Sequence, residues 1–340
     1  MQPYRRPYQG VGSGYKIGGY NWRKRGRYTE NGDWRYDYTI FDKYVDSLIS
    51  WGISEQISCQ SPVGWNSDLL PYWSSSENNW KALAAPVGSD IYAERLDHFL
   101  TDFKSHLDAK GWFNKSVLYL DEVEPQILSR IIGTIKDNHP DWKIGMAGFH
   151  SPTDYVDSSV YDMCLMVGTE GNPGRINRNT RSSFYTSCNP IRPNNFVVGD
   201  AQLAENRWLG WHAQQMNYNG FLRWAFDYWV NNDPNEQRNG SFTSGDFSLA
   251  YRSSNDLDME ICSSLRLELI RDGIEDYEKI SILKAHLGQS EEPYEEAAYI
   301  LLLEKIATFV PSSGNSEELS QLVESAVQLL NKISTGADLL

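Results

Sequence analysis

The chain has 340 residues, and its 45 Asp and Glu residues against 31 Lys and Arg residues give a formal net charge of −14. Such an acidic chain repels phosphate backbones, which excludes nucleic acid as the expected partner. The aromatic content is 13 %, with 12 Trp and 20 Tyr residues. Aromatic rings on this scale are typical of packed cores and also of platforms on which sugars and other flat ligands stack.

Several further classes of protein are excluded by the sequence. No run approaches the ~20 apolar residues that a membrane span needs. The polar segment Met1–Arg6 has no apolar stretch behind it, so no signal peptide is evident. The four Cys residues lie far apart and the six His residues form no HExxH motif. We therefore expect no metal site, no disulfide scaffold and no cofactor.

In chain order, residues 1–35 are rich in Gly, Arg and Tyr, and their lack of periodicity predicts an irregular segment. Apolar residues at helical spacing then predict a series of helices, one of which begins at Pro125. The expected helices cover residues 39–53, 90–112, 125–140, 204–220, 264–288, 294–310 and 316–333. Short apolar runs predict strands at 54–62, 116–123, 143–149, 162–168, 194–200 and 220–229, with a Trp-rich loop after the first.

Strands that alternate with helices in this way predict an α/β fold with a parallel sheet. The six expected strands are fewer than the eight of a closed barrel. We expect a TIM-like (β/α) barrel that is incomplete at its N-terminus, or alternatively an open doubly wound sheet. No GxGxxG follows a strand, which disfavours a dinucleotide-binding fold. The expected domains are an irregular segment at 1–35, a catalytic barrel at 36–288 and a helical extension at 289–340.

Catalytic residues of such a barrel lie at the carboxyl ends of its strands. The segment LYLDEVEP ends an apolar strand with Asp121 and Glu122, whereas Glu124 is explained by a capping role before Pro125. Adjacent residues on a strand point to opposite faces, so the pair shares a site only if the strand ends and twists there. We expect Glu122 to act as general acid, and Asp121 to hold a 2-acetamido group of the substrate that itself attacks the anomeric carbon.

The sequence resembles glycoside hydrolase family 123, the β-N-acetylgalactosaminidases, from about residue 32 to residue 285. The resemblance is carried by YLDEVEP, FYTSCNP, NRWLGWHAQQMNYNGFLRWAFDYW and SLRLELIRDGIEDYE. It implies a TIM-like barrel, retention of configuration, an oxazoline intermediate, Glu122 as acid/base and Asp121 as the acetamido-orienting residue. It also implies an exported parent protein, periplasmic or secreted. The chain departs from the family by lacking its amino-terminal β-sandwich and the first barrel strands, and by carrying Arg252 where Pro is usual.

Further candidates for substrate contacts have packing roles as alternatives. They are Trp65, Tyr185, Trp224, Arg207 and His150, of which Arg207 has a structural ion pair as its stronger alternative. The expected partner is a glycan or glycoconjugate that ends in β-N-acetylhexosamine. Two other functions remain open: a retaining glycosidase with Asp200 or Glu170 as nucleophile, and a catalytically silent carbohydrate-binding relative.

Overall fold

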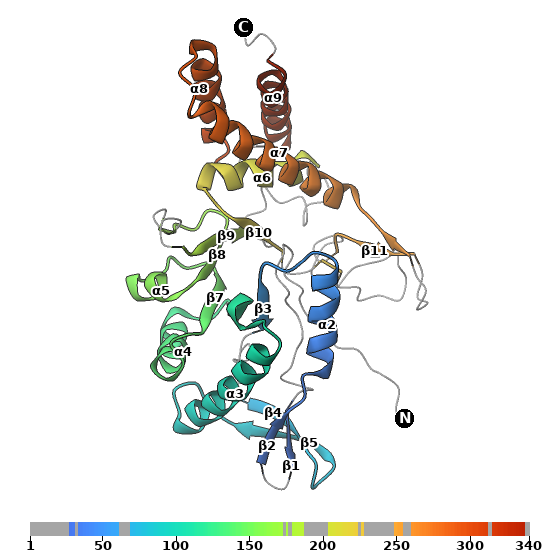
Figure 1. Ribbon diagram of the computed structural model, residues 1–340, viewed down its shortest axis with the longest axis vertical. Helices are drawn as coiled ribbons and strands as arrows, with labels where there is room; N and C mark the ends of the chain where they lie inside the picture. The colour runs from blue at the N-terminus through green and yellow to red at the C-terminus, as the bar shows by residue number, and fades with distance from the viewer. Residues whose placement is uncertain are drawn as a thin grey trace. The chain divides into compact units, whose positions relative to one another are not determined.

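A computed structural model describes most of the chain, and it divides at residues 181 and 182 into two compact units (Figure 1). The described residues are 27–30, 33–60, 69–172, 175, 179–186, 203–223, 226–227, 248–253, 260–311 and 315–336. The predicted strand at 194–200 lies outside these ranges, so it stays a prediction. The domain boundaries predicted near residues 35 and 288 also stay predictions.

The first unit is built on parallel strands in the order β3, β6, β7, β8. These strands are β3 (Ile57–Gln60), β6 (Ser116–Asp121), β7 (Lys143–Gly148) and β8 (Asp162–Met166). The helices of this unit are α2 (Thr39–Ser50), α3 (Asp90–Ala109), α4 (Pro125–Asn138) and α5 (Asp154–Ser159), with a short 3₁₀ turn, η1 (Phe113–Lys115). The four strands and helices α2, α3 and α4 confirm the predicted elements and the α/β class. Helix α5 was not predicted, because its six residues are too short to show a period.

The parallel sheet of the first unit is strongly curled. Gln56, just before β3, donates a hydrogen bond of 2.7 Å from Nε2 to Oδ2 of Asp162, the first residue of β8. In a flat sheet the first and fourth strands lie about 14 Å apart, at three strand spacings. A direct contact between their ends therefore requires the sheet to bend as part of a barrel wall does. Both side chains are buried, as is Ser58, to which the Gln56 amide also donates.

The first unit also has a second, four-stranded sheet in the order β2, β1, β4, β5, which lies next to α3 (Figure 1). Its strands are β1 (Arg27–Glu30), β2 (Asp33–Tyr36), β4 (Leu69–Ser74) and β5 (Asn79–Ala84). This sheet corrects two predictions: part of the irregular segment 1–35 and part of the Trp-rich loop form strands. The pairing of Glu30 with Asp33 leaves two residues between β1 and β2, and the sequence there is Asn-Gly, the pair that two-residue hairpin loops favour. The signal was present but the strands were too short to show alternation.

The second unit combines the parallel strands β9 and β10, a separate antiparallel pair β11 and β12, and a group of helices. Its strands are β9 (Arg181–Tyr185), β10 (Gly220–Leu222), β11 (Tyr251–Arg252) and β12 (Ile261–Cys262), and its helices are α6 (Ala204–Met216), α7 (Leu265–Leu287), α8 (Pro293–Ala307) and α9 (Ser316–Thr335). The helices confirm the predicted ones, and β10 is a shortened form of the strand predicted at 220–229. Strand β9 was not predicted; it pairs in parallel with β10, and α6 connects them.

Much of the aromatic excess is structural in both units. Trp112 and Trp142 are buried in the first unit, and Trp208 and Trp211 in the second. The ring of Trp211 stacks on Phe309 at a centroid distance of 4.9 Å, which ties the C-terminal helices to α6. Composition alone did not decide whether the aromatic rings belong to the core or to a ligand platform. Core packing accounts for these four Trp residues.

Helices α6 and α7 cross so closely that a side chain at the crossing is excluded. A Cβ atom on Gly210 of α6 would lie 1.9 Å from the backbone oxygen of Gly273 in α7. We expect Gly210→Ala to lower the free energy of unfolding in urea by about 1–3 kcal/mol, because one backbone must move. The matched control is Gly133→Ala in α4, whose Cβ would meet only the Tyr155 hydroxyl at 3.6 Å. That control should be neutral or stabilising by up to about 1 kcal/mol, and equal losses in the two variants would contradict the close crossing.

Candidate active site

Strand β6 ends in a sharp backbone turn that carries the two consecutive carboxylates. Val117, Leu118 and Leu120 of β6 are buried, and Asp121 is the last residue of the strand. Glu122 then adopts a left-handed backbone conformation with φ of 46°, which residues other than Gly, Asn and Asp seldom adopt. Its N–H still donates to the Ala147 carbonyl of β7 at 2.9 Å. The strict alternation of side chains ends here, as a shared site for adjacent residues requires.

The charge of Glu122 affects the pKa of Asp121. The pKa of Asp121 is raised to about 6, first because surrounding protein atoms displace its hydration and second because of the Glu122 charge. The Asp121 side chain nevertheless keeps solvent-accessible surface, so the displacement of water is only partial. Groups with such shifts gather at functional sites. A carboxylate with this pKa changes its charge just below neutral pH.

The left-handed conformation of Glu122 has a measurable cost in stability. Glycine adopts such a conformation without strain, so Glu122→Gly relieves it, although glycine also gains freedom in the unfolded chain. We expect Glu122→Gly to be more stable than Glu122→Gln by about 0.5–1 kcal/mol in urea denaturation. Glu122→Gln is the control because it also removes the charge but keeps the Cβ atom. A Gly variant less stable than the Gln variant would contradict the strain.

A hollow opens beside Glu122, between the carboxyl ends of β6 and β7. It is small and mostly apolar, and its lining comes from the end of β7, from the segments that follow β6 and β7, and from the first turns of α4 and α5. The lining residues are Glu122, Val123, Pro125, Leu128, Met146, Gly148, Phe149, His150, Ser151, Pro152, Thr153 and Val156. The structure thus brings together two of the predicted site residues, Glu122 and His150.

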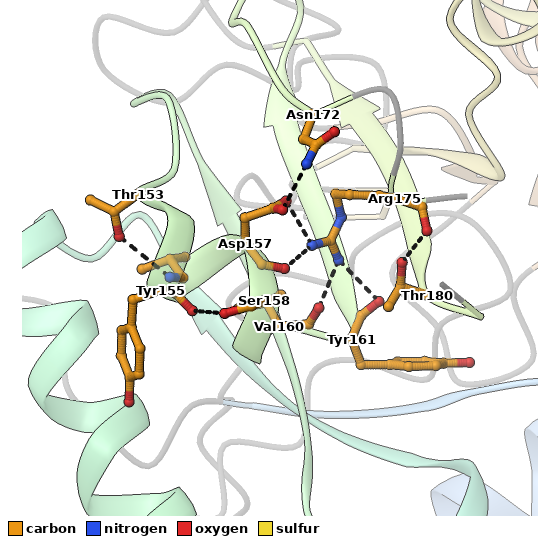
Figure 2. A network of polar contacts seen from close by, with 10 residues as sticks. Thr153, Tyr155, Asp157, Ser158, Val160, Tyr161, Asn172, Arg175 and Thr180 are labelled. Atoms are coloured by element: carbon orange, nitrogen blue, oxygen red, sulfur yellow. Dashed lines mark hydrogen bonds and ion pairs between the residues drawn. The ribbon is translucent and has the colours of Figure 1, made fainter. Parts of the chain in front are cut away.

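One wall of the hollow is held by a buried network of polar contacts (Figure 2). Arg175, only 2 % exposed, donates from Nη1 to Oδ1 of Asp157 at 3.0 Å and from Nη2 to the Val160 carbonyl at 2.7 Å. Asn172 donates to the other oxygen of Asp157 at 3.0 Å. Because Asp157 belongs to α5, the network fixes this short helix against the segment that follows β8. The N-cap residue of α5, Thr153, and its neighbour Val156 both line the hollow.

The remaining predicted residues fall into two groups. Trp65, Trp224 and the alternative nucleophile Asp200 lie outside the described residues, so their roles stay predictions. Tyr185 is buried at the end of β9, and the other alternative nucleophile, Glu170, is exposed in the segment after β8.

Arg207 lies on α6 with its guanidinium committed to a partner on α7. Its Nε and Nη2 atoms donate to the two carboxylate oxygens of Asp276 at 2.7 and 2.8 Å. Trp211 adds a third hydrogen bond to Asp276, from Nε1 at 2.9 Å. Asp276 is 1 % exposed, and a buried carboxylate needs such a set of donors. This geometry matches the structural alternative for Arg207; a role in binding substrate hydroxyls stays a prediction.

Two residues of the site were missed from the sequence. Phe149 ends the predicted strand at 143–149 beside His150, so its position at a strand end was an available signal. Arg175 lies in a stretch with no periodicity, and nothing in the sequence indicates its burial.

Among the described residues, no three His, Cys, Asp or Glu side chains are placed to hold a metal ion. Within the same ranges, no helix has the length and apolar content that crossing a bilayer requires.

Comparison with known proteins identifies the family. Residues 25–283 match the family model described as glycoside hydrolase 123, catalytic domain. A solved structure of a family 123 glycoside hydrolase from Clostridium perfringens, described in terms of glycolipid glycan hydrolysis, superposes with a TM-score of 0.76 at 25 % sequence identity. The match covers 91 % of this chain and 57 % of that one, so this chain spans little more than half of its neighbour. No curated protein matches the sequence. The chain belongs to glycoside hydrolase family 123.

Proposed function

We propose that the chain is the catalytic part of a retaining exo-β-N-acetylgalactosaminidase that works by substrate-assisted catalysis. The observation that carries the proposal is the pair Asp121 and Glu122 at the end of β6, with the backbone turned at Glu122 and the Asp121 pKa raised to about 6. Family membership supports hydrolysis of a glycosidic bond. The structural neighbour supports a glycoconjugate as the class of substrate, since its description names a glycolipid glycan.

In the first step, the Glu122 carboxylic acid gives its proton to the glycosidic oxygen. The carbonyl oxygen of the substrate's 2-acetamido group forms a bond to the anomeric carbon as the bond to the leaving group breaks. The Asp121 carboxylate accepts a hydrogen bond from the acetamido N–H and balances the positive charge that develops on that group. The products of this step are the protonated leaving group and a sugar with an oxazolinium ring, or an oxazoline ring where the N–H proton has passed to the Asp121 carboxylate.

In the second step, water attacks the anomeric carbon and the Glu122 carboxylate takes up its proton. The bond from the carbonyl oxygen to the anomeric carbon breaks, which restores the acetamido group. Two displacements at the same carbon give net retention of the β-configuration. Glu122 ends the cycle protonated and ready for the next substrate, so atoms and charge balance without a cofactor.

The proposal extends to the context of the site. The curled sheet of the first unit supports membership of a TIM-like barrel, in which the carboxyl ends of the strands carry the chemistry. The substrate is a glycan or glycoconjugate that ends in β-N-acetylgalactosamine, and the parent protein is exported. The family resemblance is the support for both the sugar and the location.

The pH dependence of activity should report the Asp121 carboxylate. Its pKa is raised to about 6, so it is ionised above that pH and neutral below it. Only the ionised form balances the positive charge that develops on the acetamido group. We therefore expect kcat/KM to fall as the pH decreases through about 6, by up to tenfold per pH unit. A profile that stays flat down to pH 4.5 would contradict this role of Asp121.

The mechanism is tested with a thiazoline analogue of the sugar intermediate. In this compound sulfur replaces the oxygen of the oxazoline ring, so the compound mimics the intermediate but resists hydrolysis. We expect competitive inhibition at least about 10²-fold tighter than that by N-acetylgalactosamine, because intermediates of this kind are bound better than ground states. No inhibition, together with covalent labelling of Glu170 or Asp200 by a fluorosugar, would instead establish a protein nucleophile.

A further inference from the structure

The hairpin of β4 and β5 has one face on which every side chain is apolar. Side chains alternate between the two faces of a sheet, and directly paired residues share a face. The pairs on this face are Leu69 with Ala84, Pro71 with Ala82, and Trp73 with Trp80. We call these six residues the hairpin face. Leu69 and Trp80 are each 51 % exposed, and Ala82 and Ala84 are exposed as well.

The opposite face of the same sheet is the one that packs inward. Leu70 and Tyr36 pack against the hydrophobic core of the first unit. The Tyr36 ring meets Phe99 of α3 edge-on at a centroid distance of 5.2 Å (Figure 1). On that face Trp34 also contacts Tyr72, at a centroid distance of 4.9 Å. The sheet is therefore anchored to the protein by its inner face, and the hairpin face points away from α3.

The hairpin face has the chemistry of a surface that meets a lipid bilayer. None of its side chains carries a charge, and its only side-chain groups that form hydrogen bonds are the indole N–H groups of Trp73 and Trp80. The two rings lie edge to face, with centroids 5.6 Å apart. Indole favours the boundary between hydrocarbon and headgroups, because its ring is apolar and its N–H reaches water. A glycan would find no other side chain here to pair with its hydroxyl groups, which favours lipid as the occupant.

The charges around the hairpin face also favour a neutral lipid. On the same face of the sheet, two strands from Trp73, Arg35 and Asp33 form an ion pair of 3.8 Å between Nη2 and Oδ2, so their charges balance. The net charge of the chain is −14, which repels anionic headgroups. Contact with a zwitterionic bilayer therefore depends on the burial of apolar surface, a contribution that salt does not screen.

The hairpin belongs to the end of the parallel sheet that carries the carboxylates. Strands β4 and β5 lie in the connection between the carboxyl end of β3 and the start of α3. Asp121 and Glu122 lie at the carboxyl end of β6, the neighbour of β3. In α/β folds, connections at this end surround the ligand. A bilayer that meets the hairpin is thus at the end of the sheet where the substrate has to enter.

We propose that the hairpin face docks on lipid bilayers and so brings the enzyme to glycans that lipids carry. The inference rests on the proposed function, which takes a glycoconjugate that ends in β-N-acetylgalactosamine. It adds the surface by which the enzyme finds one class of conjugate. Contiguous exposed apolar surface of this kind marks sites of interaction.

The first test measures binding of the full chain to phosphatidylcholine vesicles that carry no sugar, by co-sedimentation. We expect Trp80→Ala to lower the partition coefficient by about five- to tenfold, the scale of one half-exposed aromatic side chain. Raising NaCl from about 0.1 M to about 0.5 M should change it less than about twofold. The matched control is Trp51→Ala, which removes a 73 % exposed Trp at the C-cap of α2, outside the hairpin face, and should bind as the unaltered chain does.

The second test presents one glycan on two carriers. A glycolipid that ends in β-N-acetylgalactosamine is placed in phosphatidylcholine vesicles, and the same oligosaccharide is supplied free in solution. We expect Trp80→Ala to lower kcat/KM for the vesicle-borne glycan by about five- to tenfold. For the free oligosaccharide we expect a change of less than about twofold, which also shows that the variant is folded.

Several results would overturn the bilayer surface. They include no binding of the unaltered chain to bare vesicles, and no loss of binding in Trp80→Ala. Equal losses on both carriers would show that Trp80 contacts the glycan itself. A dimer in solution that Trp80→Ala converts to a monomer would show that the face joins two copies of the chain. Failure of the unaltered chain to cleave the free oligosaccharide would instead overturn the proposed function, and vesicle binding would still decide the surface.

Discussion

Replacing Glu122 with Gln is expected to lower kcat/KM for an unactivated disaccharide by about 10²- to 10⁴-fold, the contribution of a well-placed general acid. The amide keeps the size of the side chain but has no acidic proton to give to the glycosidic oxygen. The left-handed backbone turn at residue 122 is unaffected, because Gln and Glu carry the same Cβ atom. The loss therefore measures proton transfer rather than the shape of the site.

The leaving group identifies the step that is lost. The dinitrophenolate of a 2,4-dinitrophenyl glycoside leaves without being protonated. The rate of its first step should therefore fall at least about tenfold less in Glu122→Gln than the rate for the disaccharide. In the second step the Gln variant has no base to activate water, so hydrolysis of the intermediate stays slow. Azide is a nucleophile that needs no base, so it should speed turnover and give the β-glycosyl azide. A matched control is Glu124→Gln, at the exposed N-cap of α4, which should retain activity. Equal losses on both substrates without rescue by azide would contradict the assigned role.

The part of this site that sequence predicts best is the part that depends on one strand alone. The apolar run before Asp121 indicates a buried strand, and its carboxyl end is where α/β folds place chemistry. The same local logic predicts α3, because Leu96, Phe99 and Phe103 recur at helical spacing and are all buried.

Features that depend on the order of strands were not predictable in this way. The hollow beside Glu122 exists because β6 and β7 are neighbours in the sheet, so residues 122 and 149 meet although 26 residues separate them in the chain. The buried Arg175 depends on carbonyl groups at the end of α5, a helix too short to be predicted. Strand β9 was missed because five residues show too little alternation to separate a strand from a loop.

The backbone at Glu122 illustrates the same division. Residue type predicted a carboxylate at the strand end, and the need for a shared site predicted a twist there. The size of that twist is a property of the folded chain, since nothing about a Glu residue favours a φ of 46°. Strained backbone that persists at a strand end is typical of functional sites, where the surrounding structure over-determines it.

Replacing Asp121 with Asn is expected to lower kcat/KM by about 10²- to 10³-fold, the loss typical when one group that stabilises developing charge is removed. The amide is nearly the same size as the carboxylate, but it has no charge to balance the oxazolinium. The decrease of kcat/KM below about pH 6 should disappear in this variant, because the carboxylate that causes it is gone. The thiazoline analogue should lose affinity by a factor close to the loss in kcat/KM, whereas N-acetylgalactosamine should lose less, because it carries no such charge.

Stability separates this loss of function from misfolding. The pKa of Asp121 is raised in the folded chain, so its charge costs stability fully above pH about 6 and not at all well below the ordinary value of 3.8. Asn carries no charge at any pH. We therefore expect Asp121→Asn to melt at a temperature equal to or above that of the unaltered chain at pH 8, with the difference vanishing near pH 3. A variant that is inactive and also less stable at pH 8 would show a structural role, whereas one that is inactive and more stable would show that Asp121 is kept charged for catalysis at the expense of the fold.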